Sequence, residues 1–166
     1  MKHVLRFINK MNMEKLKLYT LLIPFFILAW SCKTHPSQTP MKFETIVYNE
    51  YGPEMERTEK WINTQQDFEE TYRYLYQNMS SLPEFPEIDF DKNAVVFIHF
   101  GQFSYGGIHY DVKEIEAKNN ELNIFLKYNG PKLGQPALTV MTNPFMLIQV
   151  PKIKPNPEVI NIILED

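Results

Sequence analysis

Residues 94–100, Ala-Val-Val-Phe-Ile-His-Phe, constrain the fold more than any other part of the sequence. A short run of β-branched and aromatic residues that is apolar on both alternating faces is typical of a strand buried on both sides. A glycine ends this run. A pair of glycines then precedes residues 108–113, in which apolar and polar side chains alternate. The sequence therefore predicts a central strand followed by a half-buried one.

The second of these strands is predicted to continue into a hairpin over residues 108–128. Asn119 and Asn120 tolerate positive φ and predict a tight turn, after which the side chains at 122, 124, 126 and 128 alternate inward. Further strands are predicted over residues 43–48, 137–142, 145–150 and 159–164, with 54–61 either a strand or a loop. The expected fold is mainly β (α+β), an antiparallel β-sandwich or curled sheet of about seven strands.

One amphipathic helix is predicted to begin at Thr64, which is a good N-cap residue. Asp67 stands three positions later, as a short-armed capping-box partner. Apolar residues follow at helical spacing and form one stripe: Phe68, Tyr72, Leu75, Tyr76 and Met79. We expect this stripe to pack on a face or an edge of the sheet.

Residues 1–31 have the composition of a secretory signal peptide. A basic segment precedes an apolar run over residues 18–30, which is too short for a transmembrane helix of about 20 residues and is interrupted by Pro24. The sequence Leu28-Ala29-Trp30-Ser31-Cys32 resembles the lipobox of bacterial lipoproteins. The resemblance implies that the Cys32 thiol receives a lipid and that Cys32 becomes the first residue of the mature chain. The alternatives are an ordinary signal peptide and an uncleaved anchor.

The mature chain is expected to consist of a polar tether over residues 32–41 and a single globular domain over 42–166. Without residues 1–31, 12 of the 17 basic and 19 of the 20 acidic residues remain, which gives a formal charge of −7. Such a charge argues against a nucleic-acid partner, because phosphates require clustered cations. Anionic headgroups would also repel the domain, so the acyl chains must hold it at a bacterial membrane. We therefore expect a protein of the cell envelope.

Residues 88–151 resemble the C-terminal domain of PrcB-type proteins, which are lipoprotein subunits of a bacterial surface protease complex. The resemblance rests on these pieces: Asp89-Phe90, Phe100-Gly101, Tyr105-Gly106-Gly107-Ile108, residues 122–126, Pro136, Thr142-Asn143-Pro144-Phe145 and Val150-Pro151. It implies a non-enzymatic, lipid-anchored domain that associates with or stabilises a partner protein, such as a protease.

The best catalytic combination in the sequence is Ser104, His109 and Asp111, but Ser104 lacks the signature of a nucleophile elbow. A metal site would need His99 to join His109 and Asp111 from a neighbouring strand. His99 lies in an apolar strand, so we expect a core histidine that is hydrogen-bonded to a backbone carbonyl. The sequence therefore predicts no enzyme, no metal and no cofactor.

The loop between the two central strands is the candidate site for a protein partner. Two aromatic residues on a glycine-framed loop are typical of an interface hot spot, and protease inhibitors use such loops as well. Its residues are Gln102, Phe103, Ser104, Tyr105, Gly106 and Gly107. The glycines alone are also explained by a turn or a β-bulge. The competing hypothesis is a carbohydrate-binding platform of Tyr105, Tyr110 and Tyr128, against which the predicted inward orientation of the last two counts.

Overall fold

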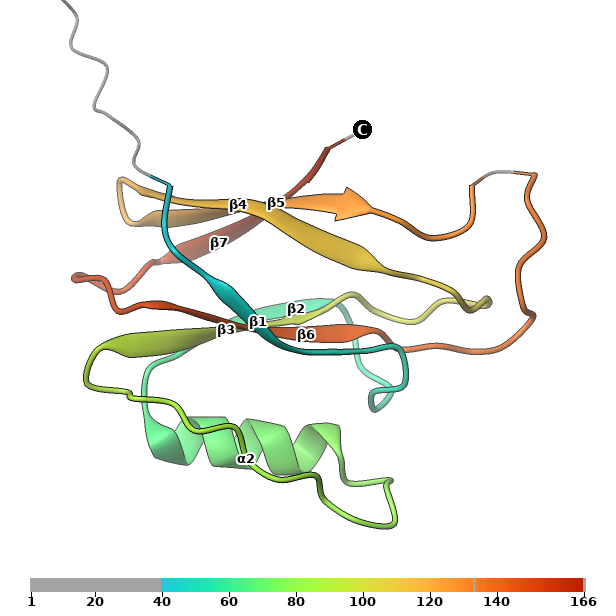
Figure 1. The fold of residues 1–166 in the computed structure, drawn as a ribbon, viewed down its shortest axis with the longest axis horizontal. Helices are drawn as coiled ribbons and strands as arrows, with labels where there is room; N and C mark the ends of the chain where they lie inside the picture. Colours follow the sequence, from blue (N-terminus) through green and yellow to red (C-terminus); the bar gives the residue numbers. More distant parts are fainter. Residues whose placement is uncertain (1–39, 133, 166) are drawn as a thin grey trace, which may run out of the picture. The chain divides into compact units, whose positions relative to one another are not determined.

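The computed structural model describes residues 40–132 and 134–165, which form two β-sheets and one helix (Figure 1). The strand order is β1-β6-β3-β2 in the four-stranded sheet and β4-β5-β7 in the three-stranded sheet. The elements are β1 (Glu44–Asn49), β2 (Thr58–Ile62), α2 (Gln65–Leu75), β3 (Asn93–His99), β4 (Tyr110–Lys118), β5 (Glu121–Tyr128), β6 (Phe145–Pro151) and β7 (Val159–Glu165). The expected mainly-β fold with a single amphipathic helix is confirmed for the described residues.

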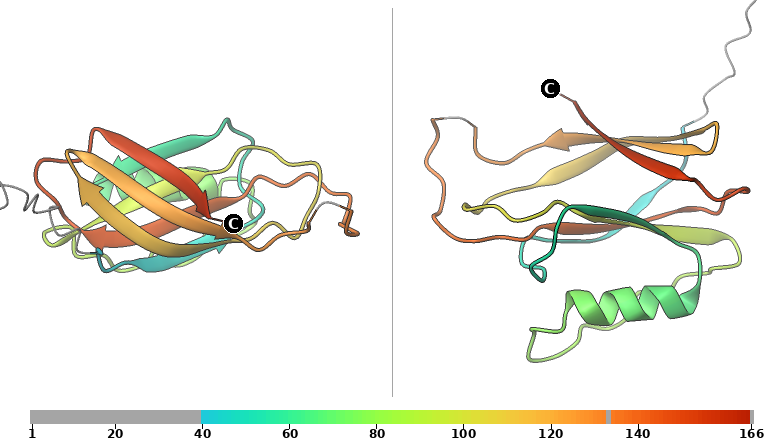
Figure 2. Two further views of the ribbon diagram at one scale, coloured as in Figure 1. Left: turned by 90° about the horizontal axis from the view of Figure 1, so that it is seen from above. Right: turned by 180° about the vertical axis from the view of Figure 1, so that it is seen from behind.

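Strand β3 is central, as predicted, because it pairs with β2 on one side and with β6 on the other. Val96 and Ile98 on one face belong to the core between the two sheets. Val95 and Phe97 on the other face pack with residues of α2. Figure 2 shows the resulting three layers from two further directions, with the four-stranded sheet in the middle. The apolar character of both faces of β3 follows from this position.

Helix α2 begins as predicted, with Thr64 as the N-cap. The Asp67 amide donates to Thr64 Oγ1 at 3.2 Å, and the Thr64 hydroxyl donates to Asp67 Oδ2 at 2.8 Å. Phe68, Tyr72 and Leu75 are buried against the four-stranded sheet. The helix ends at Leu75, so Met79 lies beyond it and is 48% exposed. The predicted stripe is therefore right up to Tyr76 and wrong at Met79.

The predicted hairpin is formed by β4 and β5, with Asn119 and Asn120 at φ values of 51° and 64° in the turn. Four strand pairs are antiparallel, but β7 pairs with β5 in parallel. Residues 152–158 carry the chain from β6 in one sheet to the edge of the other. Strand β7 therefore does not form a hairpin with the strand that precedes it. The expectation of an entirely antiparallel sandwich is wrong at this one pair.

Residues 137–142 were predicted as a strand, but they form only an isolated bridge, between Phe103 and Thr142. The predicted signal peptide, Cys32 and most of the predicted tether lie outside the described residues. Within residues 40–132 and 134–165, no helix has the length and apolar character needed to cross a membrane.

Candidate protein-binding face

Three segments that are distant in sequence meet at one end of the sandwich: residues 49–53, 101–107 and 138–144. We call this surface the end face. It lies at the right-hand side of Figure 1, where the loops after β1, β3 and β5 come together. Each segment adjoins a strand at one end: the first two follow β1 and β3, and the third leads into β6, so the packed sheets fix one end of each.

Main-chain hydrogen bonds join the 101–107 loop to the 138–144 segment. Phe103 and Thr142 exchange two backbone bonds, of 2.8 Å and 2.9 Å. The Gly106 amide donates to Leu138 O at 2.9 Å, and the buried Thr142 hydroxyl donates to Tyr105 O at 2.9 Å. The loop is therefore held along its length and is more than a turn between two strands.

The 49–53 segment is joined to both of the others, chiefly through Glu50. Its carbonyl accepts the Asn143 amide at 2.8 Å, and its carboxylate accepts the Gly107 amide at 3.0 Å. The Gly52 amide donates to Asn143 O at 2.9 Å. These bonds satisfy backbone groups that strand pairing does not reach, so the end face has a defined backbone.

The two aromatic residues of the loop are less exposed than the sequence suggested. Phe103 and Tyr105 are half-buried, pack against the core between the sheets and contact each other edge to face, with ring centroids 5.9 Å apart. Of the other predicted binding residues, Gln102, Ser104 and Gly107 are exposed and Gly106 is buried. The prediction of exposed aromatic anchors on this loop is therefore wrong, because the open end of the β-sandwich accommodates both rings.

The glycine pair has a structural explanation. Gly107 adopts a φ of 80°, which L-residues rarely adopt. A Cβ atom on Gly106 would lie 2.9 Å from Val140 Cγ1, so any other residue at this position would require the Val140 side chain to move. The glycines thus position the two segments against each other.

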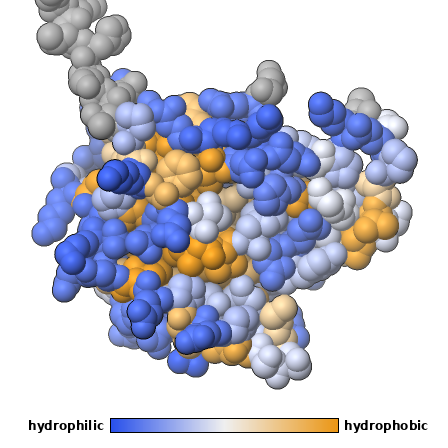
Figure 3. Space-filling view, in the orientation of Figure 1, coloured by the Kyte–Doolittle hydropathy of each residue, from blue (hydrophilic) through white to orange (hydrophobic). Residues whose placement is uncertain are grey.

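The exposed apolar side chains of the end face come from its other two segments. Leu138 is 75% exposed, Met141 53% and Val140 36%, and Tyr51 in the 49–53 segment is 60% exposed. These four are among the ten large apolar side chains that are well exposed in the described part of the chain. Figure 3 shows apolar surface on the loop that projects at the right, surrounded by more polar surface.

The start of the 101–107 loop is fixed by His99, which is completely buried at the end of β3. Its Nδ1 accepts the Gly101 amide at 3.1 Å, so the proton is on Nε2, which donates to Pro53 O at 3.2 Å. Burial lowers the pKa of His99 more than the bond to Pro53 raises it. The prediction of a core histidine bonded to a backbone carbonyl is confirmed.

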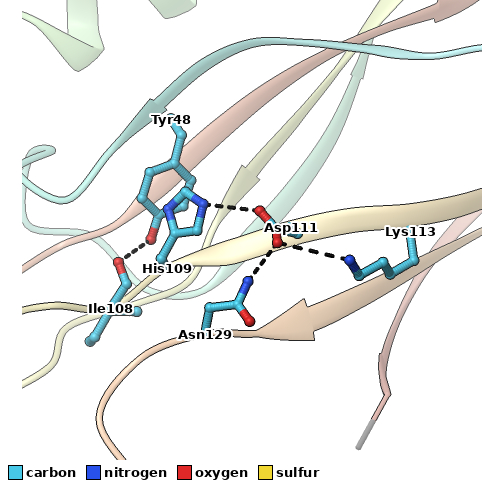
Figure 4. A network of polar contacts seen from close by, with 6 residues as sticks. All are labelled: Tyr48, Ile108, His109, Asp111, Lys113 and Asn129. Carbon is cyan, nitrogen blue, oxygen red and sulfur yellow. Dashed lines mark hydrogen bonds and ion pairs between the residues drawn. The ribbon is translucent and has the colours of Figure 1, made fainter.

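His109 and Asp111 lie beside the end face in an exposed polar network (Figure 4). His109 Nε2 lies 3.1 Å from Asp111 Oδ1, and the His109 ring packs edge to face on Tyr48 with centroids 4.5 Å apart. Asn129 and Lys113 approach the other carboxylate oxygen. Desolvation would raise the pKa of Asp111, but the hydrogen bonds from Asn129 and His109 outweigh it and lower that pKa.

The structure does not assemble the catalytic or metal combinations that the sequence offered. No hydrogen bond connects Ser104 to His109 among the described residues. His99 lies on the face of β3 that carries Val95 and Phe97 and bonds to Pro53, whereas His109 directly precedes β4 of the other sheet and bonds to Asp111, so the two imidazoles do not converge. Over the same residues, no group of three His, Cys, Asp or Glu side chains is placed to hold a metal ion.

The tyrosines of the carbohydrate hypothesis do not form an open platform. Tyr110 is 8% exposed and stacks on Phe100 with ring centroids 4.3 Å apart. Tyr128 donates to Pro131 O at 3.2 Å, and burial together with the Tyr105 hydroxyl raises the pKa of Tyr128 to about 12. Tyr110 is buried while Tyr105 and Tyr128 are half-buried, so the three rings do not present one open stacking surface.

Comparison of the chain with protein-family models, curated proteins and solved structures gives no match. The resemblance to PrcB-type proteins therefore stays a prediction. Sequence reasoning missed Tyr51, Leu138, Val140 and Met141 as surface residues. The sequence did carry one signal. Residues 129–136 are rich in proline and glycine, which favours a long loop that continues into residues 137–142 over a paired strand there.

Proposed function

We propose that this chain is a lipid-anchored, non-enzymatic protein of a bacterial cell envelope that binds a partner protein through the end face. The observation that carries the proposal is the set of exposed apolar side chains on a hydrogen-bonded backbone: Tyr51, Leu138, Val140 and Met141. Large apolar residues that share a surface with a polar rim mark interaction sites on soluble domains.

The rigidity of the end face supports binding to a folded protein. Association is less costly when the binding loops are already ordered, because no backbone entropy is lost on contact. The bonds from Phe103, Gly106 and Thr142 provide this order. Exposed Leu and Met side chains on such a frame can enter apolar pockets of a partner while the surrounding polar groups exclude water.

The chemistry of the rim indicates what such a partner presents. Glu54 and Glu56 line a shallow depression together with Gly101 and Gln102, and Arg57, the one basic residue among the described residues that line it, already pairs with Glu59 at 2.9 Å. A partner with basic groups around an apolar centre would fit this surface. The resemblance to PrcB-type proteins makes an envelope protease the first partner to test.

Photo-cross-linking from the end face tests the binding site. A photoreactive amino acid at Met141 is expected to give a discrete cross-linked product in cells that produce the full chain. The matched control is the same amino acid at Met79, a methionine of similar exposure outside the end face. Products of equal yield from both positions, or none from Met141, would contradict the proposed site.

The anchor is tested separately at Cys32. Metabolic labelling with a fatty acid is expected to label the chain, and Cys32→Ser is expected to abolish the label. Labelling that persists in Cys32→Ser would place the acyl chain elsewhere. No labelling of the unsubstituted chain would remove the lipid anchor from the proposal and leave the binding face to be judged by cross-linking alone.

A further inference from the structure

Among residues 40–132 and 134–165, no strand pairs with the outer edge of β7, and this edge lacks the features by which the other edge strands avoid pairing with another chain. Edge strands are usually protected by shortness, charges or bulges. Strand β1 has a register irregularity between Thr45 and Val47, and β2 has only five residues, with Glu59 and Lys60 among them. On β4 the ladder is irregular between Val112 and Glu114, and the carbonyl of Ile115 already accepts the Met41 amide.

Strand β7 has charged residues only at its ends, Glu165 within it and Glu158 just before it, and its centre has none of these protections. Its ladder with β5 runs without a shift from Val159 to Glu165, and residues 159–164 contain no proline and no charge. Three of its apolar side chains are well exposed: Val159 at 48%, Ile163 at 37% and Leu164 at 58%. In a parallel ladder, the backbone groups of alternate residues point away from the neighbouring strand, so this edge offers unpaired donors and acceptors.

We propose that β7 pairs with β7 of a second copy of this chain in antiparallel orientation, centred on Asn161. The sequence of the strand is self-complementary about this residue. Val159 then lies opposite Ile163 of the partner subunit, and Ile160 lies opposite Ile162 of the partner subunit. Apolar β-branched pairs form on both faces, and these are the pairs that stabilise neighbouring strands.

Charge disfavours one neighbouring register, and the polar side chain of Asn161 disfavours another. With the dyad at Asn161, Glu165 lies opposite Pro157 of the partner subunit, and Glu158 lies opposite Leu164 of the partner subunit. A dyad between Asn161 and Ile162 would place Glu158 directly opposite Glu165 of the partner subunit, and like charges opposite each other destabilise a strand pair. A dyad at Ile162 would pair Asn161 with the apolar Ile163 of the partner subunit.

The hydrogen bonds of the described residues leave the outer edge of β7 open, and β7 also approaches β2 of the other sheet. Asn161 is held from one side, because its amide nitrogen donates to Asn123 Oδ1 at 2.9 Å and to Glu121 Oε2 at 3.2 Å. The Met41 amide is bonded at β4, which lies at the opposite edge of this sheet from β7. The interface is isologous, so the assembly closes as a dimer. The two three-stranded sheets then form one continuous six-stranded sheet, and neither end face takes part in the strand pair.

Disulfide trapping tests the register. In an antiparallel pair, the Cα atoms of facing residues are about 4.5–5.5 Å apart, which suits a disulfide. The full chain with Asn161→Cys, oxidised in its native membranes, is expected to give a disulfide-linked dimer. Asn123→Cys is the matched control, because Asn123 lies on β5 beside Asn161 and would be about 14 Å from its counterpart, three strand spacings.

Two further samples complete the experiment. The unsubstituted chain reports any dimer formed through Cys32, and Ile163→Lys added to Asn161→Cys is expected to abolish the dimer while the circular dichroism spectrum is kept. No dimer from Asn161→Cys, an equal yield from Asn123→Cys, a ladder of larger oligomers, or a cross-link of Asn161→Cys to a different protein would each overturn the proposal.

Discussion

Acidification should destabilise the domain through His99, because its folded environment accommodates only the neutral imidazole. The ring is completely buried, and its Nδ1 accepts the Gly101 amide, so a proton on Nδ1 would face a donor. The pKa of His99 is lowered in the folded chain, whereas an unfolded histidine has a pKa of about 6.5. The unfolded state therefore binds more protons below that pH, and stability falls as the pH is lowered through about 6.5.

The magnitude follows from the linkage relation. Because an unfolded histidine titrates at about pH 6.5, one histidine that stays neutral in the folded chain costs at most about 1.4 kcal/mol between pH 7.5 and pH 5.5. Carboxylates with lowered pKa values, such as Asp89 and Asp111, titrate below this window and contribute little within it. Most of the pH dependence in this range should therefore come from one side chain.

Urea unfolding at the two pH values measures the effect. His99→Gln is expected to unfold more easily at both pH values but to lose most of the difference between them. His109→Gln, which changes an exposed histidine, should keep that difference. An equal pH dependence in His99→Gln and in the unsubstituted chain would refute the reasoning, as would an NMR titration that shows His99 protonating in the folded state near pH 6.5.

Three substitutions test the packing of the end face and the helix. Thr142→Val removes a buried hydroxyl and leaves Tyr105 O unpaired, which should lower the free energy of unfolding by about 1–3 kcal/mol and speed hydrogen exchange at the Gly106 amide. Unchanged exchange would contradict the hydrogen-bonded backbone of the end face. Gly52→Ala would place a Cβ atom 2.7 Å from Phe145 Cδ1 and 2.8 Å from Asn143 O, so urea unfolding should show stability lowered by about 1–3 kcal/mol. An unchanged stability would show that the 49–53 segment can shift to accept the methyl group. Thr64→Ala should lower the free energy of unfolding by about 1 kcal/mol because the helix loses its N-cap, whereas Thr64→Ser keeps the capping hydroxyl and should keep the stability. Equal losses in the two variants would show that the hydroxyl does not stabilise the helix.

The local patterns were sufficient to predict the parts of the fold that depend on neighbours in sequence. The two apolar faces of β3, the turn at Asn119 and Asn120, and the cap at Thr64 each follow from residue types within a few positions. His99 could also be assigned, because a histidine in a strand that is buried on both sides has few partners other than backbone carbonyls.

The remaining features depend on contacts between distant segments. The parallel pairing of β7 with β5 requires the chain to cross between sheets, and residues 152–158 carry no signal that specifies the destination. The burial of Phe103 depends on Thr142, 39 positions later, which bonds to its backbone. Segment 137–142 has the composition of a strand but pairs with the loop at only one position, which leaves Leu138 and Met141 exposed.

The affinity of the full chain for the partner identified by cross-linking tests the central claim, that the end face is the binding surface. We predict that Leu138→Ser combined with Met141→Ser weakens binding at least about tenfold, equivalent to about 1.4 kcal/mol. The control, Tyr74→Ser combined with Met79→Ser, removes two exposed apolar side chains elsewhere and should leave the affinity unchanged. Equal affinities for the two double variants, with both folded, would contradict the account.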